Sequence, residues 1–276
     1  MDELVGKVGL QTKVVAVVYK VNIKKGSNKN QPENFEIEAT TVWSFPKRGA
    51  WATHHPKFRG NWAPQIPRNL ILRYSKPGDL VLDSMCGSGT TLIECKLTGR
   101  NALGFDVNPK MVELSKNSLN FDTDETIPKT KIKINKGNAC CLSEVQDNSV
   151  DLIATHPPYA NIIKYSEGEI EDDLSNISNI DKFCDQMKQV ASECYRVLKP
   201  SKYCAILMGN TRRKKYFIPM AHKVMQNFID IGFKLKEDII KHQWNCKTTP
   251  YWANMSKRYN FLMIMHEHLF VFEKCG

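Results

Sequence analysis

Two short segments of this 276-residue chain carry residue types that could do chemistry, and the first is a glycine turn. An apolar run ends at Asp83 and leads into a turn that contains Gly87 and Gly89. Glycine allows a ligand to approach the backbone closely, and a helix that begins near Thr90 would point free N–H groups at that ligand. The segment lacks the third glycine of the dinucleotide-binding fingerprint, which argues against a dehydrogenase. Alone, this pattern is also that of an ordinary turn.

Two further loops strengthen the case for a nucleoside ligand. Asp106 ends the apolar run of residues 103–106, about 20 residues after the glycines, where a carboxylate can hold two ribose hydroxyls. Asn138 and Ala139 follow the run that ends near residue 135 and could contact an adenine edge. Loops at the carboxyl ends of successive parallel strands converge on one crevice. Together the three loops predict a site for a nucleoside cofactor.

The second segment is a diproline turn, Thr155-His156-Pro157-Pro158-Tyr159, which directly follows the apolar run of residues 150–154. Prolines fix the backbone and have no N–H, so the carbonyls of this turn have no competing local donors. One of these carbonyls could accept a hydrogen bond from an amino group of a substrate. The Tyr159 ring offers a face for stacking a base that has swung out of a helix. The turn therefore predicts chemistry on the amino group of a base.

Apolar runs and helical spacings alternate from residue 68 onward, and they must position these turns. Strand patterns fall at residues 80–82, 102–105, 131–135, 150–154 and 203–208. Helical spacing falls at residues 69–75, 90–97, 110–119, 181–198 and 219–231. Such alternation predicts an α/β domain with a mostly parallel sheet and helices on both faces. Two strand patterns, at residues 233–240 and 261–272, predict a closing hairpin with one antiparallel strand.

The N-terminal residues follow a different pattern. Residues 14–23 are rich in β-branched residues and predict a strand, with residues 35–42 as its partner and a polar loop between them. Residues 43–67 are aromatic, basic and irregular. We therefore expect a small N-terminal β extension over residues 1–42, followed by the unit that carries both turns.

At these motifs the chain resembles the amino-methyltransferases that modify adenine N6 or cytosine N4 in DNA. Their hallmark is Asp, Asn or Ser followed by Pro-Pro and Tyr or Phe, and residues 156–159 match it. Residues 83–91 match the family's cofactor motif, and Asp106 matches the acid at the end of the next strand. A preceding cofactor segment resembles residues 61–67, and the closing strand resembles residues 267–272. These matches run from about residue 43 to the C-terminus, with both motifs in family order.

The resemblance implies a Rossmann-like class I methyltransferase fold, with a methyltransferase domain over residues 43–276 and short recognition loops. It also implies S-adenosyl-L-methionine as methyl donor and direct transfer to a flipped base, in which positioning and electrostatics supply most of the acceleration. The catalytic residues that it implies are His156, Pro157, Pro158 and Tyr159. The cofactor-binding residues that we expect are Trp62, Gln65, Ile66, Pro67, Asp83, Met85, Cys86, Gly87, Ser88, Gly89, Thr90, Thr91, Asp106, Asn138 and Ala139. No Cys-x-x-Cys pair occurs among the nine cysteines, so we expect no metal.

His156 departs from the family pattern, which usually has an oxygen-bearing side chain at this position. A neutral imidazole has one acceptor nitrogen and can replace one such interaction, whereas an imidazolium cannot. Our hypothesis is that neutral His156 accepts a hydrogen bond from the target amino group. Activity should then fall as the pH drops through the pKa of His156, near 6.5 if unperturbed. The alternative is that His156 only packs or contacts a phosphate, and the turn carbonyl does the work.

Recognition of the substrate has to come from short pieces, because the motif spacing leaves no long insert between Asp106 and His156. The net charge of +10 suits a polyanionic partner. The candidate pieces are residues 43–62, 161–179, 211–216 and 242–259. The basic residues that we expect to contact nucleic acid are Arg48, Arg59, Lys164, Arg212, Arg213, Lys214 and Lys215.

The sequence therefore predicts a site-specific DNA methyltransferase. The Thr-x-Pro-Pro-Tyr form slightly favours cytosine N4 over adenine N6. Double-stranded DNA is the expected partner, while a cognate restriction endonuclease and a monomeric or homodimeric state stay open. No apolar run approaches the roughly 20 residues that span a bilayer, and the N-terminus has no apolar core of signal-peptide length, so we expect a cytoplasmic protein without a membrane partner.

Two other functions stay open. One is an RNA base amino-methyltransferase that acts on tRNA guanine N2 or adenine N6. The other is a catalytically inactive nucleic-acid-binding protein.

Overall fold

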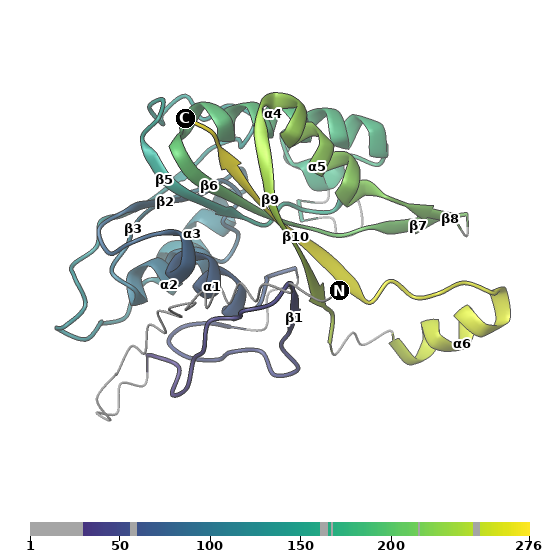
Figure 1. The fold of residues 1–276 in the computed structure, drawn as a ribbon, viewed down its shortest axis with the longest axis horizontal. Helices are drawn as coiled ribbons and strands as arrows, with labels where there is room; N and C mark the ends of the chain where they lie inside the picture. The colour runs from purple at the N-terminus through teal and green to yellow at the C-terminus, as the bar shows by residue number, and fades with distance from the viewer. Residues whose placement is uncertain (1–29, 56–59, 161–164, 167, 215, 245–248) are drawn as a thin grey trace, which may run out of the picture.

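The computed structural model describes residues 30–55, 60–160, 165–166, 168–214, 216–244 and 249–276 (Figure 1). An eight-stranded sheet runs through this part of the chain, in the order β1-β9-β10-β6-β5-β2-β3-β4. Helices cover both of its faces (Figure 1). The predicted α/β fold class is confirmed.

The parallel part of the sheet holds the strands that carry the predicted site. These strands are β2 (Leu80–Asp83), β3 (Asn101–Asp106), β4 (Ile132–Lys136), β5 (Val150–Thr155) and β6 (Leu198–Met208). β2 lies between β3 and β5 and is parallel to both. All six residues of β5 are buried, as expected for a central strand that is covered on both faces.

The other end of the sheet is antiparallel. β10 (His266–Lys274) lies between β6 and β9 (Phe233–His242) and is antiparallel to both. The predicted closing hairpin is thus confirmed, although the connection between its strands also contains helix α6 (Thr249–Tyr259), which the sequence did not predict. β1 (Val42–Ser44) adds a short parallel strand beside β9.

Alternate residues of the central strands divide the core between the two faces. Helices α4 (Ile180–Val197) and α5 (Met220–Ile231) pack on Ile153, Phe270 and Phe272 on one face. Helix α1 (Gln65–Tyr74) packs on Leu269 and Val271 on the other. On that second face, α2 (Thr90–Leu97) and α3 (Pro109–Ser118) also contribute to a cluster around Leu152. This arrangement leaves the carboxyl ends of β2, β3 and β5 together at one edge of the parallel sheet.

A buried carboxylate, Glu94 on α2, holds Trp51 and His54 against α1 and α2. It accepts hydrogen bonds from Arg68 (2.8 Å) and from the indole N–H of Trp51 (2.7 Å), and it pairs with His54 Nε2 at 2.7 Å. Burial alone would raise the pKa of Glu94, but Arg68 and His54 hold it below its usual value. His54 is only 6% exposed and is paired with Glu94, so it belongs to the interior of the protein.

The structure can be compared with only part of the predicted N-terminal β extension. Residues 14–23 lie outside the described residues. Residues 35–41 do not form the expected strand, and only Val42–Ser44 joins the sheet. The reason is a local packing preference: the Phe35 ring contacts Trp51 edge-on, and the Arg68 guanidinium lies over it at 5.1 Å.

A short hairpin, β7 (Thr211–Arg213) with β8 (Tyr216–Ile218), follows β6 and was also not predicted. None of the helices in the described part of the chain has both the length and the hydropathy needed to cross a membrane.

Candidate active site

The glycine turn after β2 is closed by backbone hydrogen bonds. Cys86 N donates to Phe105 O on β3 (2.8 Å), and Gly89 N donates to Cys86 O (2.8 Å). Gly89 has φ +83°, and a Cβ at this position would lie 2.6 Å from Ser115 Oγ on α3. Glycine is therefore required here for both backbone conformation and space.

Asp106 joins the end of β3 to this turn. Its Oδ2 accepts from Gly87 N (2.9 Å) and its Oδ1 accepts from Asn108 N (2.9 Å). Burial raises the pKa of Asp106 above its usual value. Each carboxylate oxygen can accept a second hydrogen bond, so the two backbone contacts leave capacity for a pair of ligand hydroxyls.

Asp83 joins the glycine turn to the strand that leads into the diproline turn. Its Oδ1 accepts from Thr155 Oγ1 on β5 (2.9 Å) and from Met85 N (3.2 Å), while its Oδ2 accepts from Thr91 Oγ1 (2.5 Å). Asp83 is 2% exposed, and burial raises its pKa to about 6 against the effect of the Thr91 and Thr155 hydrogen bonds. One buried side chain thus fixes the spacing of the two predicted turns.

Asn61 brings the segment before α1 against the same turn. Its Nδ2 donates to Ser88 Oγ (2.8 Å), and its Oδ1 accepts from Thr90 Oγ1. Arg48 supports Asn61 from behind through a hydrogen bond to its carbonyl oxygen (2.9 Å). Asn61 was absent from the predicted site residues, although it directly precedes Trp62, which was among them.

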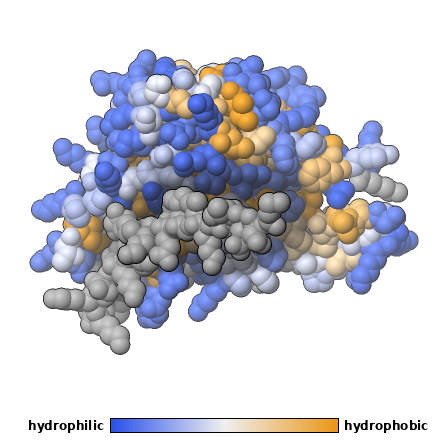
Figure 2. All heavy atoms as spheres, in the orientation of Figure 1, coloured by the Kyte–Doolittle hydropathy of each residue, from blue (hydrophilic) through white to orange (hydrophobic). Residues whose placement is uncertain are grey.

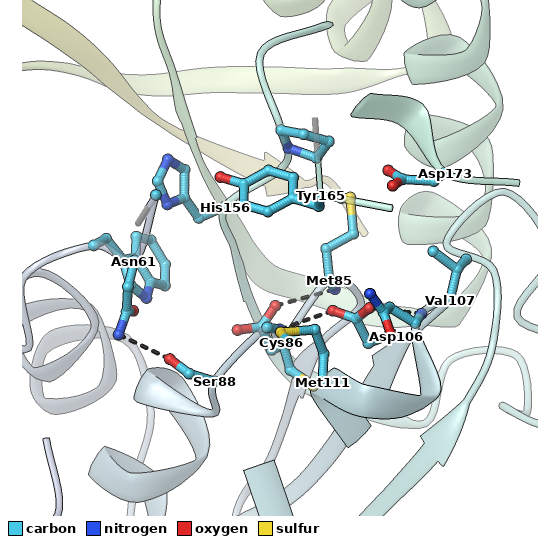
Figure 3. Close-up of a pocket in the computed structure, with 16 residues that line it drawn as sticks. Asn61, Met85, Cys86, Ser88, Asp106, Val107, Met111, His156, Tyr165 and Asp173 are labelled. Atoms are coloured by element: carbon cyan, nitrogen blue, oxygen red, sulfur yellow. Dashed lines mark hydrogen bonds between the residues drawn. The ribbon is translucent and has the colours of Figure 1, made fainter. Parts of the chain in front are cut away.

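The two turns open into one pocket, which is open to solvent on one side and measures about 660 Å³ when that open space is included. Figure 3 shows Asn61, Ser88, Cys86 and Asp106 along one side and His156 and Tyr165 across from them. The residues that line the pocket are Gly60, Asn61, Trp62, Asp83, Met85, Cys86, Gly87, Ser88, Asp106, Val107, Asn108, Met111, His156, Pro158, Tyr165 and Asp173. A shared pocket is what transfer between a cofactor and a base requires.

Nine predicted site residues line this pocket, and the others do not. Those that line it are Trp62, Asp83, Met85, Cys86, Gly87, Ser88, Asp106, His156 and Pro158. Those that lie outside its lining are Gln65, Ile66, Pro67, Gly89, Thr90, Thr91, Asn138, Ala139, Pro157 and Tyr159. Several of these hold the walls in place: Gln65, for example, accepts from Gly49 N (3.0 Å) and donates to Lys47 O (2.8 Å). Ala139 is a core residue, 4% exposed.

Some lining residues were missed by the sequence interpretation. Val107, Asn108 and Met111 directly follow Asp106, so the start of the helix after the strand-end acid was a signal that could have found them. Tyr165 and Asp173 come from a loop without a recognisable motif. Asp173 is 6% exposed and accepts from Ser166 Oγ (2.6 Å) and Ser175 N (2.8 Å). Only the folded chain brings these two to the pocket.

His156 lies in the pocket wall between an aromatic ring and a hydroxyl. Its ring stacks on Trp62, with centroids 5.6 Å apart and planes 23° apart, and its Nε2 is 2.8 Å from the Tyr159 hydroxyl. Burial lowers the pKa of His156 to about 4, although the nearby Glu267 carboxylate acts in the opposite direction. The sequence-based value near 6.5 for an unperturbed ring therefore does not apply, and His156 is neutral at pH 7.

Tyr159 lies behind His156. Its hydroxyl donates to Glu267 Oε1 (2.7 Å), and its ring packs so closely on Gly209 that a Cβ there would be 2.7 Å from the tyrosine Cε2. The ring faces that line the pocket belong to Trp62 and Tyr165 instead. The sequence predicted Tyr159 as a stacking face for a base, and in this structure its ring is engaged with the protein.

The predicted nucleic-acid contacts fall into different environments. Arg59, Lys164 and Lys215 lie outside the described residues. Arg48 is half-buried, and burial lowers its pKa to about 10. The structure thus makes it an internal support for Asn61, contrary to the phosphate contact predicted from the sequence. Lys214 is exposed in the β7–β8 turn.

The β7–β8 hairpin, helix α6 and residues 260–262 form what we call the aromatic arm. Arg212 joins its two parts, because its Nε and Nη2 donate to Leu262 O (3.1 and 2.7 Å) and its guanidinium lies over the Phe261 ring. Figure 1 shows the hairpin and α6 extending beyond the sheet on the same side of the molecule, and Figure 2 shows apolar residues on the surface there. Helix α6 has no buried residue. The large exposed side chains of the arm are Tyr216, Phe217, Tyr251, Trp252, Tyr259 and Leu262.

The pocket suits S-adenosylmethionine in charge and polarity. Asp83, Asp106 and Asp173 surround it with carboxylates that favour a cationic ligand, while Met85 and Met111 provide apolar surface. A Cβ at Gly87 would meet no atom within 4 Å, so the backbone there is open to a ligand. Among the described residues, no three His, Cys, Asp or Glu side chains gather in a way that could hold a metal ion.

Comparison with known proteins connects this pocket to methyltransferases. A solved S-adenosylmethionine-dependent methyltransferase from Methanosarcina mazei has the same fold, with TM-score 0.50 and 17% identity over 75% of this chain and 97% of that one. A tRNA (guanine(10)-N2)-dimethyltransferase of Methanocaldococcus jannaschii is 34% identical over 46% of this chain and 36% of its own length. The DNA adenine methyltransferase YhdJ of Escherichia coli is 28% identical over 46% of this chain and 44% of its own length. The chain thus spans less than half the length of these curated relatives.

Two family models match the chain. A general methyltransferase domain matches residues 82–157, from the glycine turn to the first proline of the diproline turn. The DNA methylase model matches residues 11–117 and 150–276, well over half of the chain. The chain therefore belongs to the DNA methylase family, the adenine-N6 and cytosine-N4 amino-methyltransferases that use S-adenosylmethionine.

Proposed function

We propose that this chain is a site-specific DNA methyltransferase that methylates an exocyclic amino nitrogen of a base flipped out of the double helix, with cytosine N4 favoured over adenine N6. The observation that carries the proposal is the shared pocket: Asp83 ties the glycine turn to β5, so that Gly87 and His156 line the same space. A methyltransferase with this activity would have a cognate restriction endonuclease as its partner.

The pocket residues suit a direct transfer. An exocyclic amino nitrogen is a poor nucleophile because its lone pair is delocalised into the ring. The two N–H groups of the amino nitrogen would each donate a hydrogen bond, one to a carbonyl of the diproline turn and one to neutral His156. These hydrogen bonds favour a tetrahedral nitrogen with an available lone pair. S-adenosylmethionine, held by the Asp106 side of the pocket, would supply an electrophilic methyl group and would itself become a neutral thioether, and the surplus amino proton would go to solvent. Positioning and fixed dipoles account for the rate.

Within this mechanism, each wall of the pocket has its own task. The Asp106 carboxylate and the open backbone at Gly87 would hold the cofactor, and Trp62 and Tyr165 provide ring faces against which a flipped base can stack. The aromatic arm, with its exposed rings and the basic residues Lys257 and Arg258, would contact the polymer around that base.

DNA is favoured as the polymer by the family model, which covers most of the chain, and by a Type II methyltransferase of Moraxella bovis, M1.MboII, which is 48% identical over 29% of this chain. The match to a tRNA (guanine(10)-N2)-dimethyltransferase supports a second candidate, methylation of guanine N2 in tRNA.

Parallel assays with labelled S-adenosylmethionine separate these candidates. Unmethylated plasmid DNA and total tRNA are each incubated with the protein, digested to nucleosides and analysed by mass spectrometry, with His156→Ala as the control. N4-methylcytosine in DNA is the expected product, and the variant should form at least about 100-fold less. N6-methyladenine would correct the base, and N2-methylguanosine in tRNA would replace the proposal. Cofactor binding without turnover on either polymer would indicate an inactive binding protein, and full activity of the variant would remove His156 from the mechanism.

A further inference from the structure

Behind the pocket, four side chains from two strands and the diproline turn form a continuous network of hydrogen bonds. Lys241 Nζ on β9 donates to Glu267 Oε2 on β10 (2.7 Å). Tyr159 donates to the other oxygen of Glu267 (2.7 Å), and His156 Nε2 lies 2.8 Å from the tyrosine oxygen. Lys241 and Glu267 stand next to each other across the β9–β10 pair, where Glu267 is the register partner of Lys241. Of these three hydrogen bonds, only the one between His156 and Tyr159 joins residues that are close in the sequence.

The protons available on these four side chains decide which group donates and which accepts in each hydrogen bond. Burial alone would raise the pKa of Glu267, but Lys241 holds it below its usual value, so Glu267 is an acceptor only. Tyr159 has a single hydroxyl proton, and that proton goes to the carboxylate. Toward His156 the tyrosine oxygen can then only accept. The Nε2 of His156 must therefore carry a proton.

A neutral imidazole has one proton, so the opposite nitrogen of His156 is bare. Its Nδ1 makes no hydrogen bond within the described part of the chain and is not sealed from solvent, and the side chain lines the pocket. Stacking on Trp62 limits rotation of the ring. The charged and titratable groups that face His156 are Glu267, Lys241, Tyr159 and, around the pocket, Tyr165, Asp83, Asp106 and Asp173.

We infer that Lys241, Glu267 and Tyr159 are positioning residues that hold His156 as the Nε2–H tautomer and keep Nδ1 as a hydrogen-bond acceptor for the ligand in the pocket. This inference rests on the proposed function only for the identity of that ligand group, the amino group of the target base. In this inference, the role of Tyr159 is to orient His156. The histidine, which stands where the family usually has an oxygen-bearing side chain, can then offer the ligand a hydrogen-bond acceptor as that side chain would.

Nitrogen NMR of the protein labelled with ¹⁵N-histidine tests the tautomer without any substrate. The signals of His156 are identified by their loss in His156→Asn. At pH 7 we expect a protonated Nε2 and a bare Nδ1, each with its characteristic shift. In Tyr159→Phe the Nε2 proton loses its acceptor, and the signals should move toward a mixture of both tautomers. A protonated Nδ1 in the wild type, or unchanged signals in Tyr159→Phe, would overturn the inference.

Glu267→Gln provides a second variant in case Tyr159→Phe does not fold. The amide NH₂ of glutamine can donate to the tyrosine oxygen, which releases the hydroxyl proton to point at His156. His156 should then change to the Nδ1–H tautomer. Retention of the wild-type tautomer in this variant would also contradict the inference.

Kinetics then link the tautomer to methyl transfer. Tyr159→Phe should lower kcat by about tenfold, the effect of losing one neutral hydrogen bond, and leave the Kd for S-adenosylmethionine unchanged within about twofold. Tyr195→Phe on α4 is the matched control, because it removes a hydroxyl that packs beside Gly232, away from the pocket. If the wild type methylates no polymer, the proposed function fails, yet the NMR result still decides the tautomer. Equal kcat values for Tyr159→Phe, Tyr195→Phe and wild type would show that the hydrogen bonds behind His156 do not affect the rate of methyl transfer.

Discussion

His156 shows how the surroundings of one residue determine its chemistry. Burial keeps the ring neutral, while stacking on Trp62 and the hydrogen bond with Tyr159 fix its position. Neutrality matters because only a neutral imidazole can accept a hydrogen bond from an amino group. A histidine at the first position of the diproline motif is therefore compatible with the family chemistry, provided that the ring stays unprotonated over the working pH range.

The first prediction concerns the pH dependence of activity. Because the pKa of His156 is lowered to about 4, protonation abolishes the acceptor only near that pH. The rate of methyl transfer at saturating substrate should stay level from about pH 8 to pH 5 as far as His156 is concerned. It should fall as the pH approaches the lowered pKa. An inflection near pH 6.5 that is absent in His156→Asn would contradict the assignment.

The same shift has a consequence for stability. The pKa is lower in the folded state than in the unfolded state, so below the usual histidine value of about 6.5 the unfolded chain binds a proton that the folded chain refuses. As the pH is lowered from about 6.5 to about 4, the free energy of unfolding should therefore fall. In His156→Asn the free energy of unfolding should fall by less over the same range. Urea unfolding at a series of pH values measures this difference, and identical pH dependence of the two proteins would contradict it.

At the scale of elements, strand ends and helix starts are locked together by polar side chains. Asp83 connects β2 to β5, Asp106 connects β3 to the glycine turn, and Asn61 connects the segment before α1 to the start of α2. The glycine turn also touches α3, because Gly89 lies directly against Ser115. The geometry of the pocket therefore depends on close approaches between elements as much as on the residues that line it.

Gly89→Ala tests the close approach at this turn. Gly89 and Gly78 have nearly equal positive φ angles, +83° and +87°, but an added Cβ meets Ser115 Oγ at 2.6 Å in the first case and nothing within 4 Å in the second. Both alanine variants should lose about 1 kcal/mol from backbone strain, and Gly89→Ala should lose a further ~1–3 kcal/mol from overpacking. Urea unfolding compares the two variants.

The contact with Ser115 can be relieved in a second step. Gly89→Ala combined with Ser115→Ala should recover part of the extra loss, since the Oγ that the new methyl meets is gone. Titration calorimetry should show weaker S-adenosylmethionine binding for Gly89→Ala than for Gly78→Ala. Equal unfolding free energies for the two glycine variants would show that Ser115 does not restrict the turn.

At the scale of the whole molecule, the sheet places the cofactor turn and the aromatic arm on connected parts of one surface. The parallel strands end at the pocket, while β10 and β9 continue past it toward the segment that contains α6 (Figure 1). Helix α6 buries no residue and exposes Tyr251 and Trp252. With a net charge of +10, this exposure favours an arm that contacts a polyanion.

Nucleic-acid binding should depend on this arm. Trp252→Ala should weaken binding to duplex DNA by about tenfold if the indole stacks on or wedges between bases. Arg258→Gln should weaken binding less and reduce the slope of log Kd against log salt by about one. Lys188→Gln, an exposed lysine on α4, is the control. Fluorescence anisotropy at several salt concentrations measures all three. Equal effects of Arg258→Gln and Lys188→Gln would indicate only a general charge effect, and unchanged binding by Trp252→Ala would contradict the role of the arm.

Much of the site could be predicted from the sequence because its signals are local. A strand that runs into Gly-x-Gly, an acid at the next strand end and a diproline after a buried strand each show themselves within about ten residues. Their order along the chain then placed Gly87, Asp106 and His156 at the same edge of a parallel sheet. Residues 211–216 and 242–259, which contain much of the aromatic arm, were predicted as recognition pieces from their charge and aromatic content. Their helix and hairpin gave no comparable signal, because α6 has no buried face and the hairpin strands are only three residues long.

By its sequence alone, then, this chain determined its family, its sheet with a closing hairpin and the two turns that carry cofactor and base chemistry, since spacing and turn residues act between near neighbours. The tertiary structure alone decided that His54 is buried against Glu94, that Tyr165 and Asp173 complete the pocket and that Tyr159 turns away from it toward Glu267. It also decided the protonation of His156. Burial and hydrogen bonds between residues far apart in the sequence, 40 positions for His54 and Glu94 and 108 for Tyr159 and Glu267, set these features, and no local pattern records them.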